Sequence, residues 1–287
     1  MELKVTRYEV DADGIATVWF DRPGRGNSWT SRMNAEYRWI MASLDDDARV
    51  KVIIVTGAGR QFCVGADFKA LDHYVESRND YVESVRPDAY ARPGHGVRPE
   101  YDHELIWQWG LKKPVIAAIN GACAGIALAL VTFCDFRFAV AGAKLTTAAA
   151  RLGIPAEYGL SWILPRLVGL THATDILMTA RIFTAEEGLR MGLLNDVYPA
   201  EEFDGRVRAF ARSMARSVSP VSAAITKRQL HADLFKSDPG QAIEDSKALI
   251  GKLMKLPDYR EGVAALQEKR PPAFAGLDGS SQLPEVV

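Results

Sequence analysis

The chain has 287 residues, of which 48% are hydrophobic and 25% are charged, and its formal net charge at pH 7 is −1. This length and apolar content predict one large domain, or a domain with an appendage, with a sizeable buried core. The near-neutral charge argues against nucleic acid as the main partner, and the polar N-terminus MELKVTRYEVDADG has no apolar signal core.

The N-terminal part is predicted to begin with a β-hairpin and a helix. Residues 3–10 and 14–20 have the composition of two strands joined by a turn. A helix is predicted to follow, with Thr30 or Ser31 as its N-cap. The acidic triplet at 45–47 is predicted to end this helix as a solvated turn.

A buried strand and an irregular segment are predicted next. Residues 50–56 read as the strand, a glycine-rich turn follows, and residues 62–68 lead into a short helix. Residues 72–104 are polar, contain three prolines and show no firm periodicity after residue 84. Long irregular segments in compact domains are usually functional or disordered, so we expect a mobile lid or insertion here.

The most apolar stretch lies at 115–136. A short strand at 115–119 turns at Asn120-Gly121 and enters an apolar run that is too long for a strand and reads as a buried helix. Free backbone N–H groups at the start of such a helix favour negative charge. An ordinary strand–turn–helix of an α/β core is the alternative. Because Asp135 and Arg137 interrupt the run, we interpret it as core rather than a membrane span.

The remaining chain alternates strand and helix up to about residue 198. We predict strands at 135–141 and 193–198, a helix broken near Pro165, and a further helix at roughly 171–179. Beyond this point the pattern is helical only, at 201–217, 220–235, 239–254 and 257–268. This order predicts an α/β core with right-handed crossovers and a helical C-terminal extension. Such an extension often packs on a partner subunit.

The cysteines and the glycine-rich segments match no metal, nucleotide or hydrolase motif. Cys63, Cys123 and Cys134 are odd in number and have apolar neighbours, which predicts reduced, buried thiols in a cytosolic protein; a catalytic cysteine is the alternative. The segment VTGAGRQFCVG fails the GxGxxG fingerprint because Phe62 stands at its third position. P-loop, HExxH, CxxC and GxSxG patterns are absent from the sequence.

Five segments in series resemble the enoyl-CoA hydratase/isomerase (crotonase) superfamily over roughly residues 5–275. They are GAGRQFCVGADFKAL, KPVIAAINGACAGIALALVTFCD, RLGIPAEYGLSWILPRLVG, TAEEGLRMGLLNDVYP and EGVAALQEKRPPAF. The resemblance implies an α/β crotonase-like fold of repeated β-β-α units. Residues 1–200 would form the core with the acyl-CoA site, residues 201–275 a helical trimerisation region, and residues 276–287 a flexible tail.

The resemblance also implies the partners of the protein. The substrate would be an acyl-CoA thioester, with coenzyme A entering only as part of the substrate and with no metal or redox cofactor. The protein would be a homotrimer or a dimer of trimers. We expect it in the cytoplasm, with neither nucleic acid nor membrane as a partner.

Family members bind the thioester carbonyl between two backbone N–H groups and stabilise the enolate that forms next. By position these donors would be Ala66, after Gly65, and Ile126, after Gly125. Each donor could stabilise the transition state by about 3 kcal/mol. The family often has glycine at the position of Ile126, and since only the N–H is needed, we expect a narrower pocket there.

The acid/base residues depart from the hydratase pattern of the family. Hydratases use two glutamates, and Ala129 and Ala149 stand at those positions here. Glu157 occupies the position of the catalytic acidic residue in some enoyl-CoA and dienoyl-CoA isomerases of the superfamily. The alternative is that Glu157 merely lies in the first helical turn after Pro155, where acidic residues are common.

Further positions are candidates for substrate binding. Arg60, Lys69 and Lys269 could bind the phosphates of coenzyme A, and a solvated surface role is the alternative for each. Phe68, Tyr158 and Trp162 could line the acyl pocket, with a core role as the alternative. Asp67 is interpreted as a residue that holds its loop.

We therefore expect an acyl-CoA double-bond isomerase that uses Glu157 as its sole acid/base. An enoyl-CoA hydratase and a non-catalytic acyl-CoA-binding protein are the alternatives.

Overall fold

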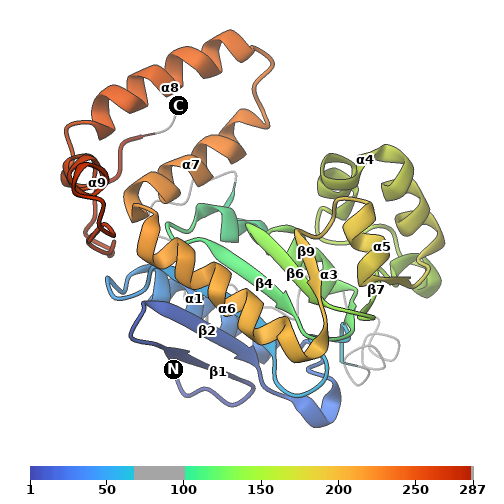
Figure 1. The fold of residues 1–287 in the computed structure, drawn as a ribbon. Helices are drawn as coiled ribbons and strands as arrows, with labels where there is room; N and C mark the ends of the chain where they lie inside the picture. Colours follow the sequence, from blue (N-terminus) through green and yellow to red (C-terminus); the bar gives the residue numbers. More distant parts are fainter. Residues whose placement is uncertain (68–100, 286–287) are drawn as a thin grey trace.

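A twisted sheet forms the centre of the computed structural model, which describes residues 1–67 and 101–285 (Figure 1). In these residues its strand order is β1-β2-β3-β4-β6-β9, with β1 and β2 antiparallel and every other neighbouring pair parallel. The strands are β1 (Thr6–Val10), β2 (Ile15–Phe20), β3 (Val52–Gly57), β4 (Val115–Ile119), β6 (Phe136–Val140) and β9 (Asp196–Tyr198). The predicted α/β core is thereby confirmed.

A second, smaller sheet has the order β5-β7-β8. Its strands are β5 (Cys123–Ala124), β7 (Lys144–Thr146) and β8 (Phe183–Thr184). The sequence analysis did not predict these strands. Two or three residues are too few to show a periodicity, and such strands are defined by pairing with distant segments.

The two faces of the large sheet are covered by different helices (Figure 1). Helix α1 (Ser31–Asp45) packs on one face, and the side chain of Thr30 caps it by accepting from the Met33 N–H at 3.1 Å. The apolar face of α6 (Ala200–Ser217) covers the other. Within the described residues, the remaining elements before α6 are η1 (Pro23–Arg25), η4 (Ile106–Gly110), α3 (Ile126–Thr132), η5 (Ala149–Leu152), α4 (Leu160–Thr179) and α5 (Ala185–Arg190).

Two local predictions were wrong. Asp45 is 2% exposed instead of lying in a solvated turn, and its Oδ1 accepts the backbone N–H groups of Lys112 at 2.7 Å and Lys113 at 3.2 Å. These two buried donors need an acceptor. The chain also stays helical through Pro165, and α4 kinks instead at Gly169, whose φ of 74° and ψ of 159° are non-helical. Glycine adopts this positive φ readily, whereas residues with a Cβ rarely do.

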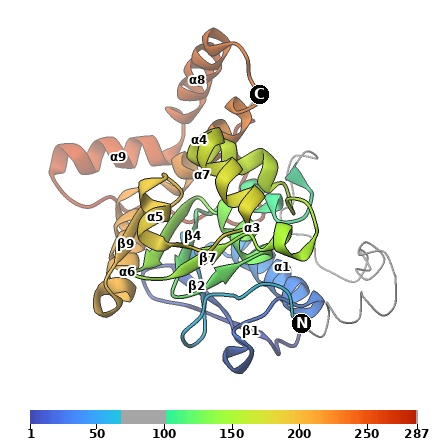
Figure 2. The same ribbon diagram turned by 90° about the vertical axis from the view of Figure 1, so that its right-hand side faces the viewer.

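The C-terminal helices have nearly the predicted bounds. After α6 come α7 (Pro220–Asp233), α8 (Pro239–Leu253) and α9 (Pro257–Glu268). In both views α8 projects away from the sheets (Figures 1 and 2). Among the helices that the structure describes, none combines the length and the apolar character needed to cross a bilayer.

Helix α7 is anchored to the core by a buried ion pair. Lys227 of α7 donates to Asp135 Oδ2 at 2.7 Å and to the carbonyl of Lys113 at 3.2 Å. The N–H of Val115 donates to the same Asp135 oxygen at 2.7 Å, and His231 Nε2 lies 3.7 Å from Oδ1. Burial alone would raise the pKa of Asp135, but Lys227 and these hydrogen bonds outweigh it and lower that pKa.

The start of the C-terminal tail is also anchored. We predicted a flexible tail over 276–287, but Leu277 is 5% exposed and its carbonyl accepts from Lys113 Nζ. Lys112 Nζ donates to the carbonyl of Asp278 at 3.0 Å. The two lysine ammonium groups therefore tie the first residues of the tail to the core.

The Asp135–Lys227 pair gives the first testable prediction. Lys227→Met leaves a buried carboxylate without its main cationic partner, so we expect the free energy of unfolding to fall by about 3–5 kcal/mol in denaturant titrations. Since the folded-state pKa of Asp135 lies below its ordinary value of 3.8, its stabilisation is complete above that value and is lost as the pH falls through the folded-state pKa.

The control for this prediction is the double variant Lys227→Met with Asp135→Asn. It removes the buried charge as well, so it should recover part of the lost stability. If Lys227→Met alone left the unfolding free energy unchanged, the ion pair would not anchor α7.

Candidate active site

A parallel β-bridge between Cys63 and Cys123 brings two distant loops together. The N–H of Cys63 donates to the carbonyl of Ala122 at 3.1 Å, and the N–H of Ala124 donates to the carbonyl of Cys63 at 3.0 Å. Beyond the bridge, the loops that carry Ala66 and Ile126 stay close together. A Cβ on Gly65 would lie 3.2 Å from the carbonyl oxygen of Ala124, and a Cβ on Gly125 would lie 3.9 Å from the Cα of Gly65.

The N–H of Ala66 points away from the loop that supports it. Ala66 pairs with Trp29 in a second parallel bridge, made by Trp29 N–H to Gly65 carbonyl at 2.7 Å and by Asp67 N–H to Trp29 carbonyl at 3.1 Å. These bonds use the groups flanking Ala66, so its own N–H faces the opposite side. Because Ala66 is exposed, this donor can meet a ligand.

The N–H of Ile126 is the second donor, at the first residue of α3. The first four N–H groups of an α-helix have no acceptor within the helix. Gly125 makes the preceding turn with a φ of 55° and a ψ of −125°, a conformation that residues with a Cβ rarely adopt. The N–H of Gly125 donates to the carbonyl of Thr146 at 3.0 Å, so the turn is held by the small sheet.

The carboxylate of Glu157 lies beside both loops. A Cβ on Gly125 would lie 3.9 Å from Glu157 Oε2, and equally 3.9 Å from the Cα of Gly65 and from the carbonyl oxygen of Thr147. Burial raises the pKa of Glu157 above its ordinary value of 4.5. Because α4 begins only at Leu160, the alternative that Glu157 occupies a first helical turn is wrong.

The two positions at which hydratases carry glutamates are closed and apolar in this protein. Ala129, in α3, is 0% exposed, and Ala149, at the start of η5, is 3% exposed. Neither side chain can accept or donate a proton. Glu157 is thus the acidic side chain that the sequence analysis singled out and that lies beside the Gly125 turn.

The other predicted binding residues are spread more widely. Arg60 is exposed in the turn after β3, and Tyr158, next to Glu157, packs against the main core. Trp162 stacks on Phe235 with ring centroids 5.5 Å apart. Lys269 is the exposed C-cap of α9, a helix that both views place far from α3 (Figures 1 and 2).

Two predicted site residues and most of one segment cannot be placed. Phe68 and Lys69 lie outside the described residues. The same holds for the predicted lid at 72–104, except for its last four residues.

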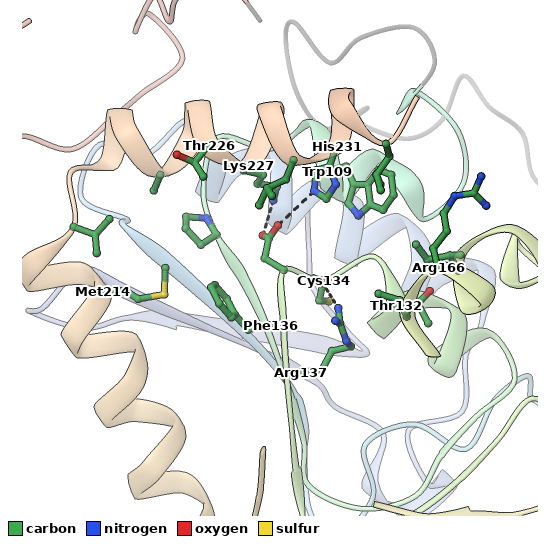
Figure 3. A pocket seen from close by; sticks show the side chains of 18 of the residues that line it. Trp109, Thr132, Cys134, Phe136, Arg137, Arg166, Met214, Thr226, Lys227 and His231 are labelled. Carbon is green, nitrogen blue, oxygen red and sulfur yellow. Dashed lines mark hydrogen bonds and ion pairs between the residues drawn. The ribbon is translucent and has the colours of Figure 1, made fainter. Parts of the chain in front are cut away.

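A separate groove of about 490 Å³ lies beneath α7 (Figure 3). Lys227 and His231 point from α7 toward Asp135, and His231 is stacked on Trp109 with ring centroids 3.9 Å apart. Among the described residues that line this groove, none is a predicted site residue. The sequence analysis missed this cluster because α7 and Asp135 are distant in the chain.

The thiols do not offer an alternative catalytic group. Cys63, Cys123 and Cys134 are all buried and free, and burial raises the pKa of Cys63 and of Cys134 to about 12. Nucleophilic cysteines need a thiolate and hence a lowered pKa. Across residues 1–67 and 101–285, no group of three or more His, Cys, Asp or Glu side chains could hold a metal ion.

A family model and several known proteins match most of this chain. A model of the family described as enoyl-CoA hydratase/isomerase matches residues 11–277. A protein named as a probable enoyl-CoA hydratase from Rhodobacter capsulatus is 35% identical, covering 96% of this chain and 100% of its own. The 1,2-epoxyphenylacetyl-CoA isomerase of Escherichia coli is 30% identical, covering 92% and 95%.

A solved structure shares the architecture. The crystal structure of an enoyl-CoA hydratase from Bacillus anthracis matches with a TM-score of 0.82 at 25% identity, covering 95% of this chain and 100% of that one. The fold that the resemblance implies is thereby confirmed.

The environment of Glu157 gives the second prediction. Since burial disfavours its charged form, its carboxyl should titrate above 4.5 in a ¹³C NMR titration of glutamate-labelled protein. The carboxyl resonance of Glu157 would be assigned as the one that is missing from the spectrum of the Glu157→Gln variant. A pKa at or below 4.5 would contradict this account, because burial would then not be the dominant influence on the carboxyl group.

Proposed function

The chain belongs to the enoyl-CoA hydratase/isomerase family, and we propose that it moves a double bond in an acyl-CoA thioester by way of an enolate. The proposal rests on one observation. The carboxylate of Glu157 lies beside the Gly65 and Gly125 turns, whereas Ala129 and Ala149 remove the two acid/base groups that hydration uses.

The backbone donors act first in the proposed mechanism. The thioester oxygen of a 3-enoyl-CoA accepts hydrogen bonds from the N–H groups of Ala66 and Ile126. These bonds shorten as negative charge develops on the oxygen, and each stabilises the transition state by about 3 kcal/mol. The hydrogens on C2 become more acidic because the carbanion is delocalised onto this oxygen.

Glu157 then moves the proton. Its carboxylate takes one proton from C2, and the electron pair forms a dienolate conjugated with the C3–C4 double bond. The carboxylic acid returns the proton to C4, the double bond moves to C2–C3, and the oxygen loses its charge. A raised pKa suits this role, since a more basic carboxylate abstracts the proton with a smaller energetic penalty.

Hydration is the alternative activity, favoured by the hydratase names among the relatives. It requires a base that activates water for attack at C3 and an acid that protonates C2. Glu157 would have to serve both steps. The buried apolar positions of Ala129 and Ala149 provide no second group.

The assembly and setting are proposed on separate grounds. A homotrimer or dimer of trimers would cover the apolar side chains that the C-terminal helices expose. Examples are Ile243 and Ile250 on α8 and Leu266 on α9, which are 60%, 57% and 81% exposed. A cytoplasmic location is supported by the free cysteines. The proposed chemistry requires no metal or redox cofactor.

The third prediction tests the proposed function with purified protein and paired 3-enoyl-CoA and 2-enoyl-CoA substrates. We expect conjugated 2-enoyl product from the former and little 3-hydroxyacyl-CoA from the latter. Glu157→Gln should lower isomerisation by about 10²–10⁴-fold while acyl-CoA binding is retained. Glu201→Gln, which changes an exposed glutamate on α6, is the matched control.

Other outcomes would decide between the alternatives. Rapid formation of 3-hydroxyacyl-CoA would contradict the isomerase proposal and favour hydration. Acyl-CoA binding without turnover of either substrate would favour a non-catalytic binding protein.

A further inference from the structure

The loop at residues 22–28 is hydrogen-bonded to the beginning of the loop that carries Ala66. Asn27 is fully buried, and its Nδ2 donates to the carbonyls of Ala58 at 2.9 Å and Gln61 at 2.7 Å. Its Oδ1 accepts the N–H of Arg22 at 2.8 Å. One amide side chain thus links the turn after β3 to the start of the 22–28 loop.

The 22–28 loop also binds the end of the Ala66 loop, through the side chain of Asp67. Asp67 Oδ2 accepts from Ser28 Oγ at 2.9 Å and lies 2.9 Å from Arg22 Nη2. Arg22 Nη1 also donates to the carbonyl of Ser28 at 2.7 Å. The Arg22 and Asp67 side chains are only 21% and 14% exposed, so solvent screens this pair less than it screens a surface pair.

Ala66 lies between these two attachments. Its peptide is flanked by the bridge to Trp29, and the next residue, Asp67, is held by the guanidinium of Arg22. Turning the Ala66 N–H would require Asp67 to leave Arg22, Ser28 or both. The direction of that N–H is therefore coupled to the side-chain ion pair between Arg22 and Asp67.

We propose that Arg22 and Asp67 are positioning residues that aim the N–H of Ala66 at the thioester oxygen. This inference rests on the proposed function and extends it, because it names the side chains that hold one of the two donors. It differs from a purely structural role: the ion pair should change the strength of the hydrogen bond to the carbonyl, not only the stability of the fold.

The chain offers a graded set of variants. Asp67→Asn keeps the size of the side chain and an acceptor for Ser28 but removes the charge that faces Arg22. Arg22→Lys keeps the positive charge but loses the planar group that donates to Ser28 and Asp67 together. Asp21→Asn is the matched control. Asp21 precedes Arg22 in the chain and pairs with Arg7 at 3.2 Å, and within the described residues its side chain forms no hydrogen bond or ion pair with the Ala66 loop.

The fourth prediction is a difference infrared measurement of carbonyl polarisation. The probe is a saturated acyl-CoA labelled with ¹³C at the carbonyl, taken from a chain-length series as the one that the wild type binds most tightly. Bound to the wild type, its carbonyl stretch should fall below that of the free ester. In Asp67→Asn the frequency should move part of the way back to that of the free ester, and in Arg22→Lys by a smaller amount. In Asp21→Asn the frequency should equal that of the wild type.

The decrease in kcat should be largest in the variant with the largest change in carbonyl frequency. We expect Asp67→Asn to lower kcat by about 10–100-fold, less than the 10²–10³-fold of a deleted oxyanion donor, with KM changed by no more than about twofold. Because Arg22 and Asp67 act as a unit, adding Arg22→Lys to Asp67→Asn should have little further effect.

Two different results would contradict the proposed function and the positioning role of Arg22 and Asp67, respectively. If the wild type bound the probe without lowering its carbonyl frequency, the oxyanion hole and hence the proposed function would be wrong. If the wild type lowered the frequency and Asp67→Asn lowered it equally, while thermal stability fell, the ion pair would be structural only and this inference would be wrong.

Discussion

The site depends on the close approach of two turns, fixed by the parallel bridge between Cys63 and Cys123. The approach leaves no room for a side chain on Gly121, because its Cβ would lie 2.0 Å from the carbonyl oxygen of Arg60 in the other turn. This contact sets the register of the two loops. The two proposed donors, the N–H groups of Ala66 and Ile126, lie in these loops, so the electrostatic centre of the proposed site is made of main-chain atoms and tolerates side-chain change.

That main-chain construction explains how one fold accommodates different proton chemistry. In the proposed mechanism the oxyanion donors are the backbone N–H groups of Ala66 and Ile126, whose side chains take no part. The acid/base groups are side chains, and here two of their positions hold the buried Ala129 and Ala149. Glu157 approaches from a third segment, just before α4, and its partial burial raises its pKa. In the proposed mechanism one half-buried carboxylate is sufficient for a proton shift, whereas hydration needs a second proton carrier.

The sequence predicted the elements whose signals are local. Helices α7, α8 and α9 each begin with a proline at the first helical position, a strong start signal, and their bounds were nearly correct. The short strands β5 and β8, the burial of Asp45 and the Asp135–Lys227 pair were missed because each depends on a partner far away in the chain. The kink of α4 was placed at Pro165 since the positive φ of Gly169 has no local sequence signal.

The site itself was predicted from resemblance to a family rather than from residue patterns. The geometry then supplied what no pattern contains, namely that Glu157 lies beside Gly65 and Gly125. The sequence analysis interpreted Asp67 as a residue that holds its loop, but it did not identify Arg22 as the partner, because the two residues are distant in the chain.

The most direct test of a single base acting on an enolate is hydrogen exchange at C2. A saturated acyl-CoA would be incubated with the enzyme in D₂O and followed by NMR. The account predicts exchange of one of the two C2 hydrogens by the wild type and loss of that exchange in Glu157→Gln. Exchange that persists in the variant, or that is absent from a wild type binding the ester, would contradict it.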